Sequence, residues 1–465
     1  MEGLEAVELK LSEVMEDNEN FRYDPEYFNK TAQAAFIRLK HHRRFVDLVK
    51  NGYRVIYENT RAIEREEGIA AGLPFFLQAA DISTPFISDQ NMICVSPEDW
   101  LRYPKGKIIH GEVLIEVKGQ AEKVAIVPDG FPLNTLVTGT VYKMSTIEEL
   151  DKYLLVSYLT CRYGQALKNR LKTNLLVSFI SKSDLYRLPV PNFNKDFKET
   201  IKNNYLFAEN LHKQSKLQDQ RGVEILLTVL GLENWRPAEP LTYQLSVKDA
   251  FIAERIDAEH FQPKYQALHE RLANSFELIT LKGTVTKGVT APYADDGTVP
   301  IIRSGDLTSL DNEDKFLLAE PGAEIFQLER GDVLISSIGF GSIGKVQVFD
   351  KPGVYGTVSE VTVIRQKRLN PYYLSFYLRS IAGQLQIERY ITGATGQLHL
   401  YPRDVSKFFV PIIPETEQIK FEEIAKKAET ARLEARTLLE RSKRAVEIAI
   451  EESEEAGHAY LKGGR

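Results

Sequence analysis

The sequence contains two similar copies of one pattern, and this internal repeat constrains the fold more than any other feature of the sequence. The motif Arg22-x-Asp-x-Glu-x-Phe28 returns 233 positions later as Arg255-x-Asp-x-Glu-x-Phe261. Further pairs follow in the same order at offsets near 220: Gly111-Glu-Val-Leu-Ile with Gly331-Asp-Val-Leu-Ile, Gly164-Gln165 with Gly383-Gln384, and Val190-Pro191 with Val410-Pro411. Each match is weak alone, but their common order indicates two copies of one structural unit.

The offset falls between the first and second pairs, and this locates an insertion. Phe28 and Gly111 are 83 positions apart, whereas Phe261 and Gly331 are 70 apart, so the first copy carries 13 extra residues. Because extra residues are tolerated best in surface loops, we expect the insertion there.

Each copy begins with a signal for a helix start and continues with short β runs. Asp24-Pro25-Glu26 and Asp257-Ala258-Glu259 place an acid at the predicted N-cap of a helix. Runs such as KVQVF and VSEVTVIR, which Gly, Pro and Asp turns bound, indicate strands. Each copy is therefore predicted to contain a mixed α/β globular domain.

Each copy ends in a long polar helix. The second helix has an apolar seam spaced by 4 and 3 residues, and the first, from about residue 198 to 230, is less regular. Small seam residues allow close approach, so the two helices are predicted to pack antiparallel and to offer a seam or partner surface. The seam residues are Ile424, Ala428, Ala431, Ala435, Leu438, Ala445 and Ala449.

The predicted fold is α+β, with two mixed α/β globular domains separated by two long antiparallel helices that form a coiled-coil spacer, in a pseudo-two-fold internal repeat. The boundaries expected are 1–192 and 241–412 for the globular domains, 193–240 for the first helical region, and 413–465 for the second, which contains the long C-terminal helix.

Composition excludes several classes of protein. The 465 residues include 59 Lys and Arg against 65 Asp and Glu, so the net charge of −6 excludes a uniformly basic protein and any basic surface must be local. The two cysteines, Cys94 and Cys161, cannot form a disulfide framework or a Cys-rich zinc site. No run is long and apolar enough to span a membrane, so a cytoplasmic protein is expected.

Two motifs that suggest enzyme chemistry have simpler interpretations. Gly339-x-Gly-x-x-Gly344 matches a dinucleotide-binding pattern, but the strand-like KVQVF follows it, so a hairpin turn is predicted. Asp99, Glu116 and Lys118 could serve a metal-dependent nuclease, although exposed charges on alternate strand positions are common. No other residues suggest an active site or a metal site.

Basic, aromatic and amide side chains gather in comparable stretches of both copies, and this mixture suits contacts with DNA phosphates and base edges. A solvated surface is the alternative for any one of them. The run Lys40-His41-His42-Arg43-Arg44 also suggests a basic patch. The predicted DNA-binding residues are Lys50, Arg54, Arg61, Lys168, Arg170 and Lys172 in the first copy, and Lys282, Lys287, Arg303, Ser304, Arg389, Thr392, Gln397, His399, Tyr401 and Arg403 in the second.

The chain resembles the specificity subunits of type I restriction-modification systems. The resemblance rests on Gly331-Asp-Val-Leu-Ile-Ser-Ser-x-Gly, Gly393-Ala-Thr-Gly-Gln followed by Tyr401-x-x-Asp404, Val410-Pro-x-x-Pro414, and the long helix that comes next. It covers essentially the whole chain. The first copy departs from it, because LKTNLLVSFISKSD stands where the second copy has GATGQLHLYPRD.

This resemblance implies a non-catalytic subunit with two target-recognition domains, each of which reads one half of a bipartite asymmetric DNA site. It implies double-stranded DNA, two methyltransferase subunits and restriction subunits as partners. The chain itself would hold no cofactor, since S-adenosylmethionine, ATP and Mg²⁺ would belong to the partners. The alternatives are the nuclease that uses Asp99, Glu116 and Lys118, and a coiled-coil scaffold that does not bind DNA.

Overall fold

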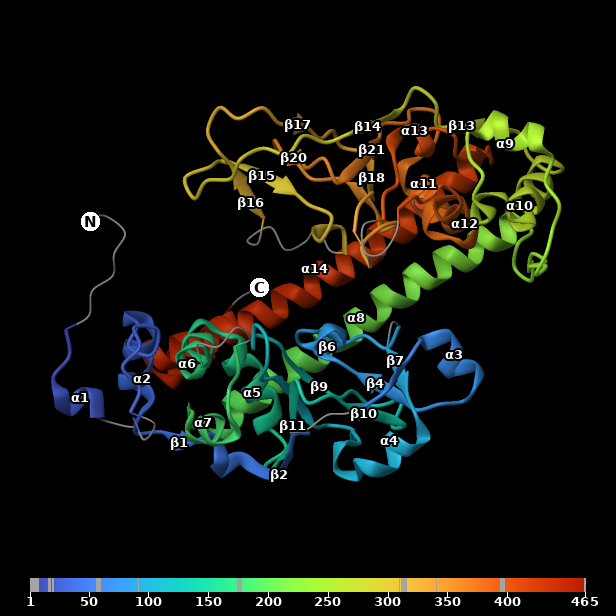
Figure 1. Cartoon of the computed structure of the whole chain (residues 1–465). Helices are drawn as coiled ribbons and strands as arrows, with labels where there is room; N and C mark the ends of the chain where they lie inside the picture. Colours follow the sequence, from blue (N-terminus) through green and yellow to red (C-terminus); the bar gives the residue numbers. More distant parts are fainter. Residues whose placement is uncertain are drawn as a thin grey trace. The chain divides into compact units, whose positions relative to one another are not determined.

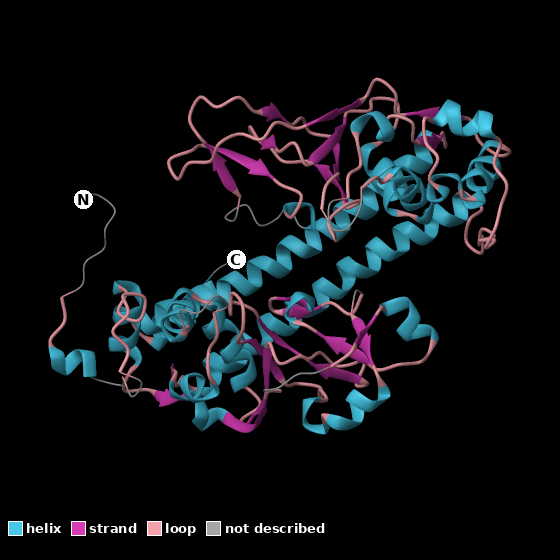
Figure 2. Ribbon diagram, in the orientation of Figure 1, coloured by secondary structure: helices cyan, strands magenta, loops and turns pink. Residues whose placement is uncertain are grey.

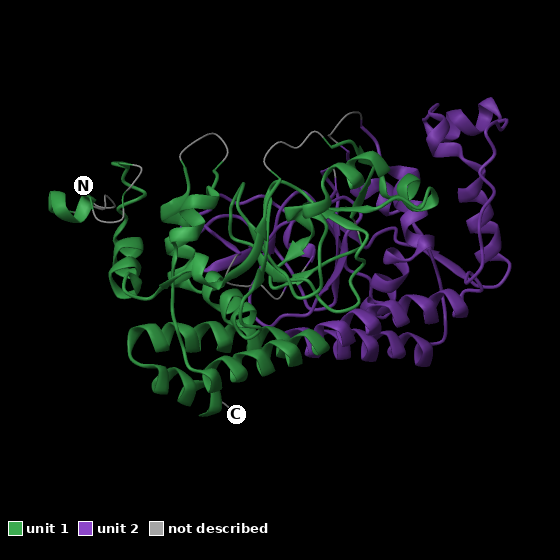
Figure 3. Ribbon diagram, turned by 90° about the horizontal axis from the view of Figure 1, so that it is seen from below, with its two compact units in different colours: residues 1–211, 434–465 green, residues 212–433 purple. Residues whose placement is uncertain are grey.

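The computed structural model describes residues 8–15, 18, 21–55, 60–90, 92–173, 178–308, 310, 316–339, 341–393 and 398–463. They form two compact units, which Figure 3 colours separately: unit 1 combines residues 1–211 with 434–465, and unit 2 contains residues 212–433. No helix in the described ranges is both long and apolar enough to cross a membrane.

Unit 1 is built on two four-stranded sheets (Figure 1). One sheet has the order β2-β11-β8-β9 and is antiparallel throughout, whereas the other has the order β10-β4-β7-β3, in which β10 runs parallel to β4. Two small pairs, β1-β12 and β5-β6, complete its strands. The bounds are β1 Arg43–Arg44, β2 Val49–Tyr53, β3 Ala62–Ile63, β4 Phe75–Leu77, β5 Ile82–Ser83, β6 Phe86–Ile87, β7 Ile93–Val95, β8 Val113–Glu116, β9 Val124–Ile126, β10 Thr135–Val137, β11 Val141–Thr146 and β12 Pro189–Val190.

The helices of unit 1 flank these sheets, and two of them are the ends of long helices that continue into unit 2. Short 3-10 turns lie at Phe45–Leu48, Ala79–Asp81 and Pro104–Gly106. The helices are α1 Leu11–Met15, α2 Lys30–Leu39, α3 Arg65–Ala70, α4 Pro97–Arg102, α5 Asp151–Thr160, α6 Arg162–Leu171, α7 Lys182–Arg187, the start of α8 Lys195–Val229, the end of α14 Glu415–Glu451, and α15 Glu454–Gly463.

Unit 2 repeats this plan. Its antiparallel sheet has the order β14-β21-β18-β19, and its second sheet has the order β16-β15-β20-β17, in which β15 and β20 are parallel. The strands are β13 Leu278–Thr280, β14 Val285–Lys287, β15 Val299–Ile302, β16 Leu317–Ala319, β17 Phe326–Gln327, β18 Asp332–Ser336, β19 Val346–Phe349, β20 Gly356–Thr357, β21 Val361–Ile364 and β22 Phe409–Pro411. The helices wholly in unit 2 are α9 Val247–Ala253, α10 Pro263–Ala273, α11 Pro371–Arg379, α12 Ile381–Tyr390 and α13 Pro402–Val405, with 3-10 turns at Ala258–Phe261 and Asp306–Thr308.

The repeat in the sequence is therefore a repeat in the fold. The antiparallel sheets correspond strand by strand, the helix pair α5-α6 corresponds to α11-α12, and the pair β1-β12 corresponds to β13-β22. Unit 1 differs by α3, α4 and the β5-β6 hairpin, which lie in the segment that carries the 13 extra residues. Figure 2 shows the same mixture of helices and strands within each unit, which confirms the predicted fold class.

In the repeated Gly-acid-Val-Leu-Ile motif, the Val-Leu-Ile part forms a strand that is buried on both faces. In β8, Val113 and Ile115 belong to the core beside the helices, while Leu114 belongs to the core between the sheets. In β18, Val333 and Ile335 alternate with Leu334 in the same way. Because neighbouring strand residues point to opposite faces, a strand between two cores must be apolar throughout.

The Gly-acid part of the same motif builds a turn. Gly111 and Gly331 both have positive φ, of 79° and 93°, where a side chain would be strained. The following acid accepts a hydrogen bond from a backbone N–H three residues earlier, of Ile109 in one unit and of Glu329 in the other. Each acid also pairs with a cation from another strand segment, Glu112 with Lys143 at 2.7 Å and Asp332 with Arg365 at 2.8 Å.

The Gly-Gln motif joins two helices closely. The side-chain amide of Gln165 donates to the carbonyl oxygen of Leu159, and that of Gln384 donates to that of Leu378, both at 2.8 Å. A Cβ atom on Gly164 would lie 2.0 Å from the carbonyl oxygen of Tyr158. The repeated motifs therefore maintain the fold.

The long helices run antiparallel, as predicted. Within unit 1, Asn204 of α8 donates to Ser442 of α14 at 3.2 Å, and the backbone N–H of Asn194, just before α8, donates to Glu454, just after α14, at 2.8 Å. Residue numbers thus fall along α14 as they rise along α8. Every seam residue is buried or half-buried, namely Ile424, Ala428 and Ala431 in unit 2 and Ala435, Leu438, Ala445 and Ala449 in unit 1.

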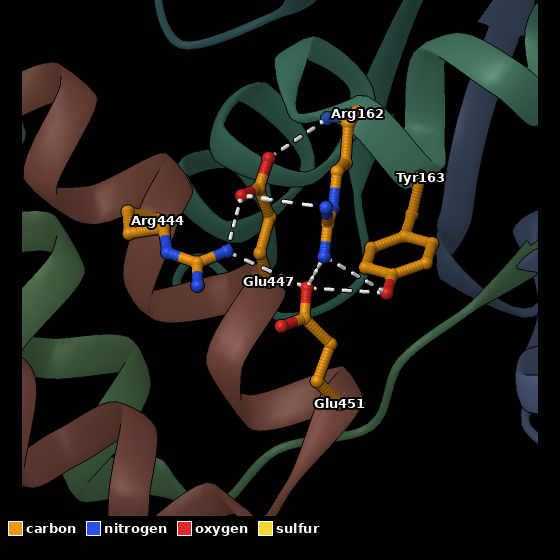
Figure 4. Close-up of polar contacts among 5 residues, drawn as sticks. All are labelled: Arg162, Tyr163, Arg444, Glu447 and Glu451. Carbon is orange, nitrogen blue, oxygen red and sulfur yellow. Dashed lines mark hydrogen bonds and ion pairs between the residues drawn. The ribbon is translucent and has the colours of Figure 1, made fainter.

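A charged cluster attaches the end of α14 to the start of α6 in unit 1 (Figure 4). The backbone N–H of Arg162 donates to Glu447 at 3.0 Å, so a side chain of α14 caps α6. The guanidinium of Arg162 and the hydroxyl of Tyr163 both donate to Glu451. Burial opposes ionisation of Glu451, but these hydrogen bonds outweigh it and hold its pKa below the usual value. Arg444 adds a bond to Glu447 at 3.0 Å.

Two expectations about helix ends were wrong. Asp24 does not cap an α-helix: it pairs with Arg22 at 2.7 Å and accepts the N–H of Tyr27 in a turn, and α2 begins after Asn29. Asp257 likewise pairs with Arg255, and a 3-10 turn rather than an α-helix follows it. In both copies, the arginine two residues earlier binds the carboxylate and competes with the helix N-terminus for it. The N-cap pattern takes no account of this arginine.

The C-terminal region also departs from one uninterrupted helix. The α14 helix ends at Glu451, and Ser453 then accepts the N–H of Ala456 with its hydroxyl to start α15. A Cβ atom on Gly457 would lie 2.6 Å from the carbonyl oxygen of Ala445, so α15 folds back against α14 within unit 1.

Candidate nucleic-acid interface

Three of the predicted DNA-binding residues form an exposed stack in unit 2. The rings of His399 and Tyr401 are parallel, with centroids 5.8 Å apart, and the guanidinium of Arg403 lies 5.5 Å from the Tyr401 ring. The side chain of Arg403 is 81% exposed. Asp404 lies 3.8 Å from it, which is too long for a tight pair. The stack therefore presents a cation and an aromatic face to solvent.

The stack rests on a short backbone ladder between Thr392 and His399. Thr392 and His399 exchange two backbone hydrogen bonds, of 2.9 and 2.8 Å, and Leu400 donates to Ser337 at 2.8 Å. This ladder joins the chain segments that contain Thr392, His399 and Ser337. Gln397, which the sequence singles out for base reading, lies outside the described residues.

A second predicted pair, Arg303 and Ser304, lies beside this ladder. The hydroxyl of Ser304 donates to the carbonyl oxygen of Glu360 at 3.2 Å, and the backbone N–H of Ser337 donates to the same oxygen at 2.8 Å. Ser337 thus connects this pair to Leu400. Arg303 is already engaged, because a hydrogen bond to Asp306 raises its pKa and keeps it charged.

The other predicted DNA-binding cations of unit 2 do not belong to the stack. Lys282 and Lys287 are both exposed, the second on β14 opposite Thr362 of β21. Arg389 is half-buried at the end of α12 beside two tyrosine rings. Its guanidinium lies 5.5 Å from the centroid of the Tyr390 ring. Its buried Nε has no hydrogen-bond partner among the described residues.

Unit 1 has the same ladder with different side chains. Phe179 stands where unit 2 has His399, and the guanidinium of Arg54 covers its ring at 4.2 Å. The Nε of Arg54 also donates to the carbonyl oxygen of Gly139 at 2.7 Å. The sequence prediction did not include Phe179, because the residue is apolar. Its correspondence to His399 in the repeat would have indicated this position. The isolated β-bridges correspond between the two units. In unit 1, Lys118 and Thr173 each form a bridge with Phe179, and in unit 2, Ile338 and Thr392 each form a bridge with His399.

Three more predicted residues of unit 1 reach its surface. Lys172 is half-buried and precedes Thr173 of the ladder, so it lies in the same region as Arg54. Lys50 is exposed on β2. Arg61 is exposed and lies elsewhere, since its backbone N–H donates to Asp99 at 3.0 Å.

Lys168 and Arg170 are buried and differ in this from the expected surface positions. Lys168 is fully buried on α6 and donates to the carbonyl oxygen of Glu122 at 3.0 Å. Arg170 is 3% exposed, with its guanidinium 4.2 Å from the ring of Tyr27 and 4.1 Å from that of Phe36. The two side chains point to different sides of α6, that of Lys168 toward Glu122 and that of Arg170 toward Phe36 of α2. Because both sides are covered, neither residue belongs to the proposed interface.

Burial of Lys168 predicts a pH-dependent stability. Burial lowers its pKa to about 7, and the charge of Lys172 acts in the same direction. Between about pH 7 and the usual lysine range, the unfolded chain therefore binds more protons at Lys168 than the folded chain does. The contribution of Lys168 to the free energy of unfolding therefore rises with pH across this range. Lys168→Met should stabilise unit 1 most below pH 7, and its advantage should shrink toward pH 10. Denaturant unfolding of both proteins at several pH values measures this difference, and an equal advantage at every pH would contradict it.

The residues of the nuclease alternative have local structural roles. Asp99 accepts hydrogen bonds from the Ser96 hydroxyl and from Arg61, and Glu116 accepts the backbone N–H groups of Glu122 and Lys123. Within the described ranges, no group of three or more His, Cys, Asp or Glu side chains could hold a metal ion. The geometry therefore gives this alternative no support.

The glycine motif is a hairpin turn, as predicted. It lies between β18 and β19, which pair antiparallel. Gly339, Gly341 and Gly344 all have positive φ, which explains the spacing without a bound nucleotide.

A protein-family model matches part of the second copy. Residues 276–440 match the family model of the type I restriction modification DNA specificity domain. A sequence search finds no similar curated protein.

Solved structures of low similarity also match. The type I restriction-modification S subunit from M. genitalium is 14% identical, with 90% of this chain and 94% of that chain covered and a TM-score of 0.32. The HsdS subunit from Thermoanaerobacter tengcongensis is 12% identical, with 90% and 96% covered and a TM-score of 0.26. The family model of the type I restriction modification DNA specificity domain matches residues 276–440, in agreement with the resemblance drawn from the motifs.

Proposed function

We propose that this chain is the non-catalytic specificity subunit of a type I restriction-modification complex, and that each globular domain reads one half of a bipartite asymmetric DNA site. The observation that carries the proposal is the repeated fold: both units have the same antiparallel sheet order, and the second matches a DNA specificity domain. Two copies of one fold with different exposed side chains suit two different half-sites.

Within this proposal the surface residues divide by chemistry. Thr392, His399, Tyr401 and Arg403 combine hydrogen-bonding groups and a stacked ring at one ladder, which suits base reading. Lys282 and Lys287 are point charges suited to phosphates. In unit 1, Arg54 and Lys172 flank the equivalent ladder, and Lys50 and Arg61 add charge.

The helical regions 193–240 and 413–465 would set the separation between the domains 1–192 and 241–412. A spacer of fixed length makes two weak half-site contacts act as one strong event only when the half-sites match its span. The same helices would dock two methyltransferase subunits, with restriction subunits joining them. S-adenosylmethionine, ATP and Mg²⁺ would be bound by these partners.

A genome-wide map of N6-methyladenine, with this gene intact and deleted, tests the proposal. Loss of methylation at one bipartite motif is the expected result, and it would also reveal both half-sites and the spacer. If methylation is unchanged, co-purification tests for a methyltransferase partner. An intact complex that footprints no half-site would overturn the proposal and favour the scaffold, whereas Mg²⁺-dependent cutting by the chain alone would favour the nuclease.

Removing the exposed guanidinium of the stack should relax one half-site only. Arg403→Ala is expected to cost about 1–3 kcal/mol of discrimination at one base pair if a bidentate contact is lost. The methylation map of a strain with this variant should show new sites that differ at one position of a single half. Arg368→Ala removes another exposed guanidinium of unit 2 and is the matched control. Equal weakening at all sequences would make Arg403 a phosphate contact.

A further inference from the structure

Unit 1 contains a basic groove that lies apart from the ladder of Phe179. Its volume is about 500 Å³, and it lies between the segment that contains Met15, Asn18 and Phe21, the end of α2, the strand β1 and the helix α7. Phe36 and Pro189 contribute apolar surface. The polar side is mainly basic and contains Lys40, His41, His42 and Arg44, with Arg187 from α7 and the neutral Asn18.

The alternation of β1 divides the basic run between the core and the groove. Arg43 points inward, where it forms a bidentate pair with the buried carboxylate of Asp151 at 2.8 and 3.1 Å. Arg44, on the opposite face of the strand, lines the groove and is exposed. The first arginine therefore holds the fold, and the second is available to a ligand.

Positive charge predominates in the groove. None of the described residues that line it carries a carboxylate. Arg187 pairs at 2.6 Å with Asp184 of its own helix. Partial burial lowers the pKa of His42, and the neighbouring His41 lowers it further, so protonation of His42 is unfavourable. A bound anion would favour the protonated form of His42.

The second copy has no equivalent basic run. Where Lys40-His41-His42-Arg43-Arg44 connects α2 to β1, the connection from α10 to β13 reads Asn274-Ser275-Phe276-Glu277. The two units share the surrounding fold, so the basic side chains of this run other than Arg43 are not required to build it. Their presence in one copy points to binding.

We infer that this groove binds a phosphate group of the DNA backbone and anchors the duplex to unit 1 outside the base-reading surface. Lysine and arginine neutralise phosphates, and imidazole N–H groups can donate to phosphate oxygens. Such contacts carry affinity without sequence information. The inference rests on the proposed function and adds that the two halves of the subunit hold DNA unequally.

Two variants of the full chain test the anchor. Lys40→Ala/Arg44→Ala removes two groove charges, and Lys105→Ala/Lys195→Ala removes two exposed charges of unit 1 outside the groove. Binding of a mixed-sequence duplex is measured from 50 to 200 mM salt. Each phosphate contact contributes a slope of about 0.9, so the groove variant should lose roughly threefold less affinity across this range for each contact removed. The control variant should keep the wild-type slope.

Chemical modification locates the contact. Diethylpyrocarbonate modifies accessible histidines, and His41 and His42 are both exposed in the groove. The same duplex, and separately inorganic phosphate at matched ionic strength with chloride as control, should slow modification of both, as followed by mass spectrometry. Thermal unfolding of both double variants identifies any loss of fold.

The outcomes separate this inference from the proposed function. Protection by the duplex with a reduced salt slope supports the anchor. Protection by phosphate alone would show an anion site that does not take DNA and would overturn the DNA assignment. An unchanged slope and no protection, with wild-type DNA binding intact, would overturn the groove while leaving the specificity function in place. No DNA binding by either the wild-type chain or its assembled complex would overturn both.

Discussion

An Ala445→Asp variant is expected to unfold unit 1 while unit 2 keeps its structure. Ala445 is fully buried on α14 in the main core of unit 1, together with Val446 of the same helix and Ile201 and Tyr205 of α8. A carboxylate placed there would be buried without a partner, which costs about 3–5 kcal/mol. Hydrogen exchange should therefore show lost protection in α5 and α6 and retained protection in α11 and α12.

The matched control places the same residue on the surface nearby. Ala459 is exposed on α15, in the same unit, so Ala459→Asp should leave protection in both units unchanged. If Ala445→Asp weakens α11 and α12 as much as α5 and α6, the two units do not have separate cores and the expectation is wrong.

A single methyl group at Gly383 should destabilise unit 2. The Cβ atom of Gly383→Ala would lie 2.3 Å from the Cα and 2.4 Å from the carbonyl oxygen of Leu378. Both are backbone atoms of the adjoining helix, so the helix pair α11-α12 must separate, and we expect a cost of about 3–4 kcal/mol.

Denaturant unfolding of unit 2 measures the effect of this glycine. Gly305→Ala is the control, because a Cβ atom there would meet nothing within 4 Å. The midpoint should fall for Gly383→Ala and stay within experimental error for Gly305→Ala. Equal midpoints for the two variants would mean that the helix pair accommodates the methyl group.

Much of the fold could be predicted because the repeat supplied two independent views of one structure. The paired Gly-acid-Val-Leu-Ile motifs indicated equivalent strands, and β8 and β18 occupy equivalent places in their sheets. The 4-and-3 spacing predicted the buried side of α14, from Ile424 to Ala449. These features depend on local periodicity, which a sequence displays directly.

The interface was harder to predict because it depends on which way each side chain points. Lys168 lies on α6 and is fully buried, whereas Lys172 follows the end of α6 and is half-buried. Basic residue type alone did not distinguish them. Phe179 was missed for the opposite reason, since an apolar residue at a ladder position resembles an ordinary core residue until its bridges to Lys118 and Thr173 are known.

The composition of unit 1 has a consequence for how the protein is made. Unit 2 is one continuous stretch, residues 212–433, whereas unit 1 needs both the first 211 residues and the last 32, which contribute Ala445, Val446 and Leu461 to its core. A ribosome releases residues 1–211 first, but they must wait until residues 434–465 have been synthesised to complete the core of unit 1. The domain synthesised second can therefore finish folding before the domain synthesised first, and a nascent chain stalled before residue 434 would hold one finished domain and one with an open apolar face.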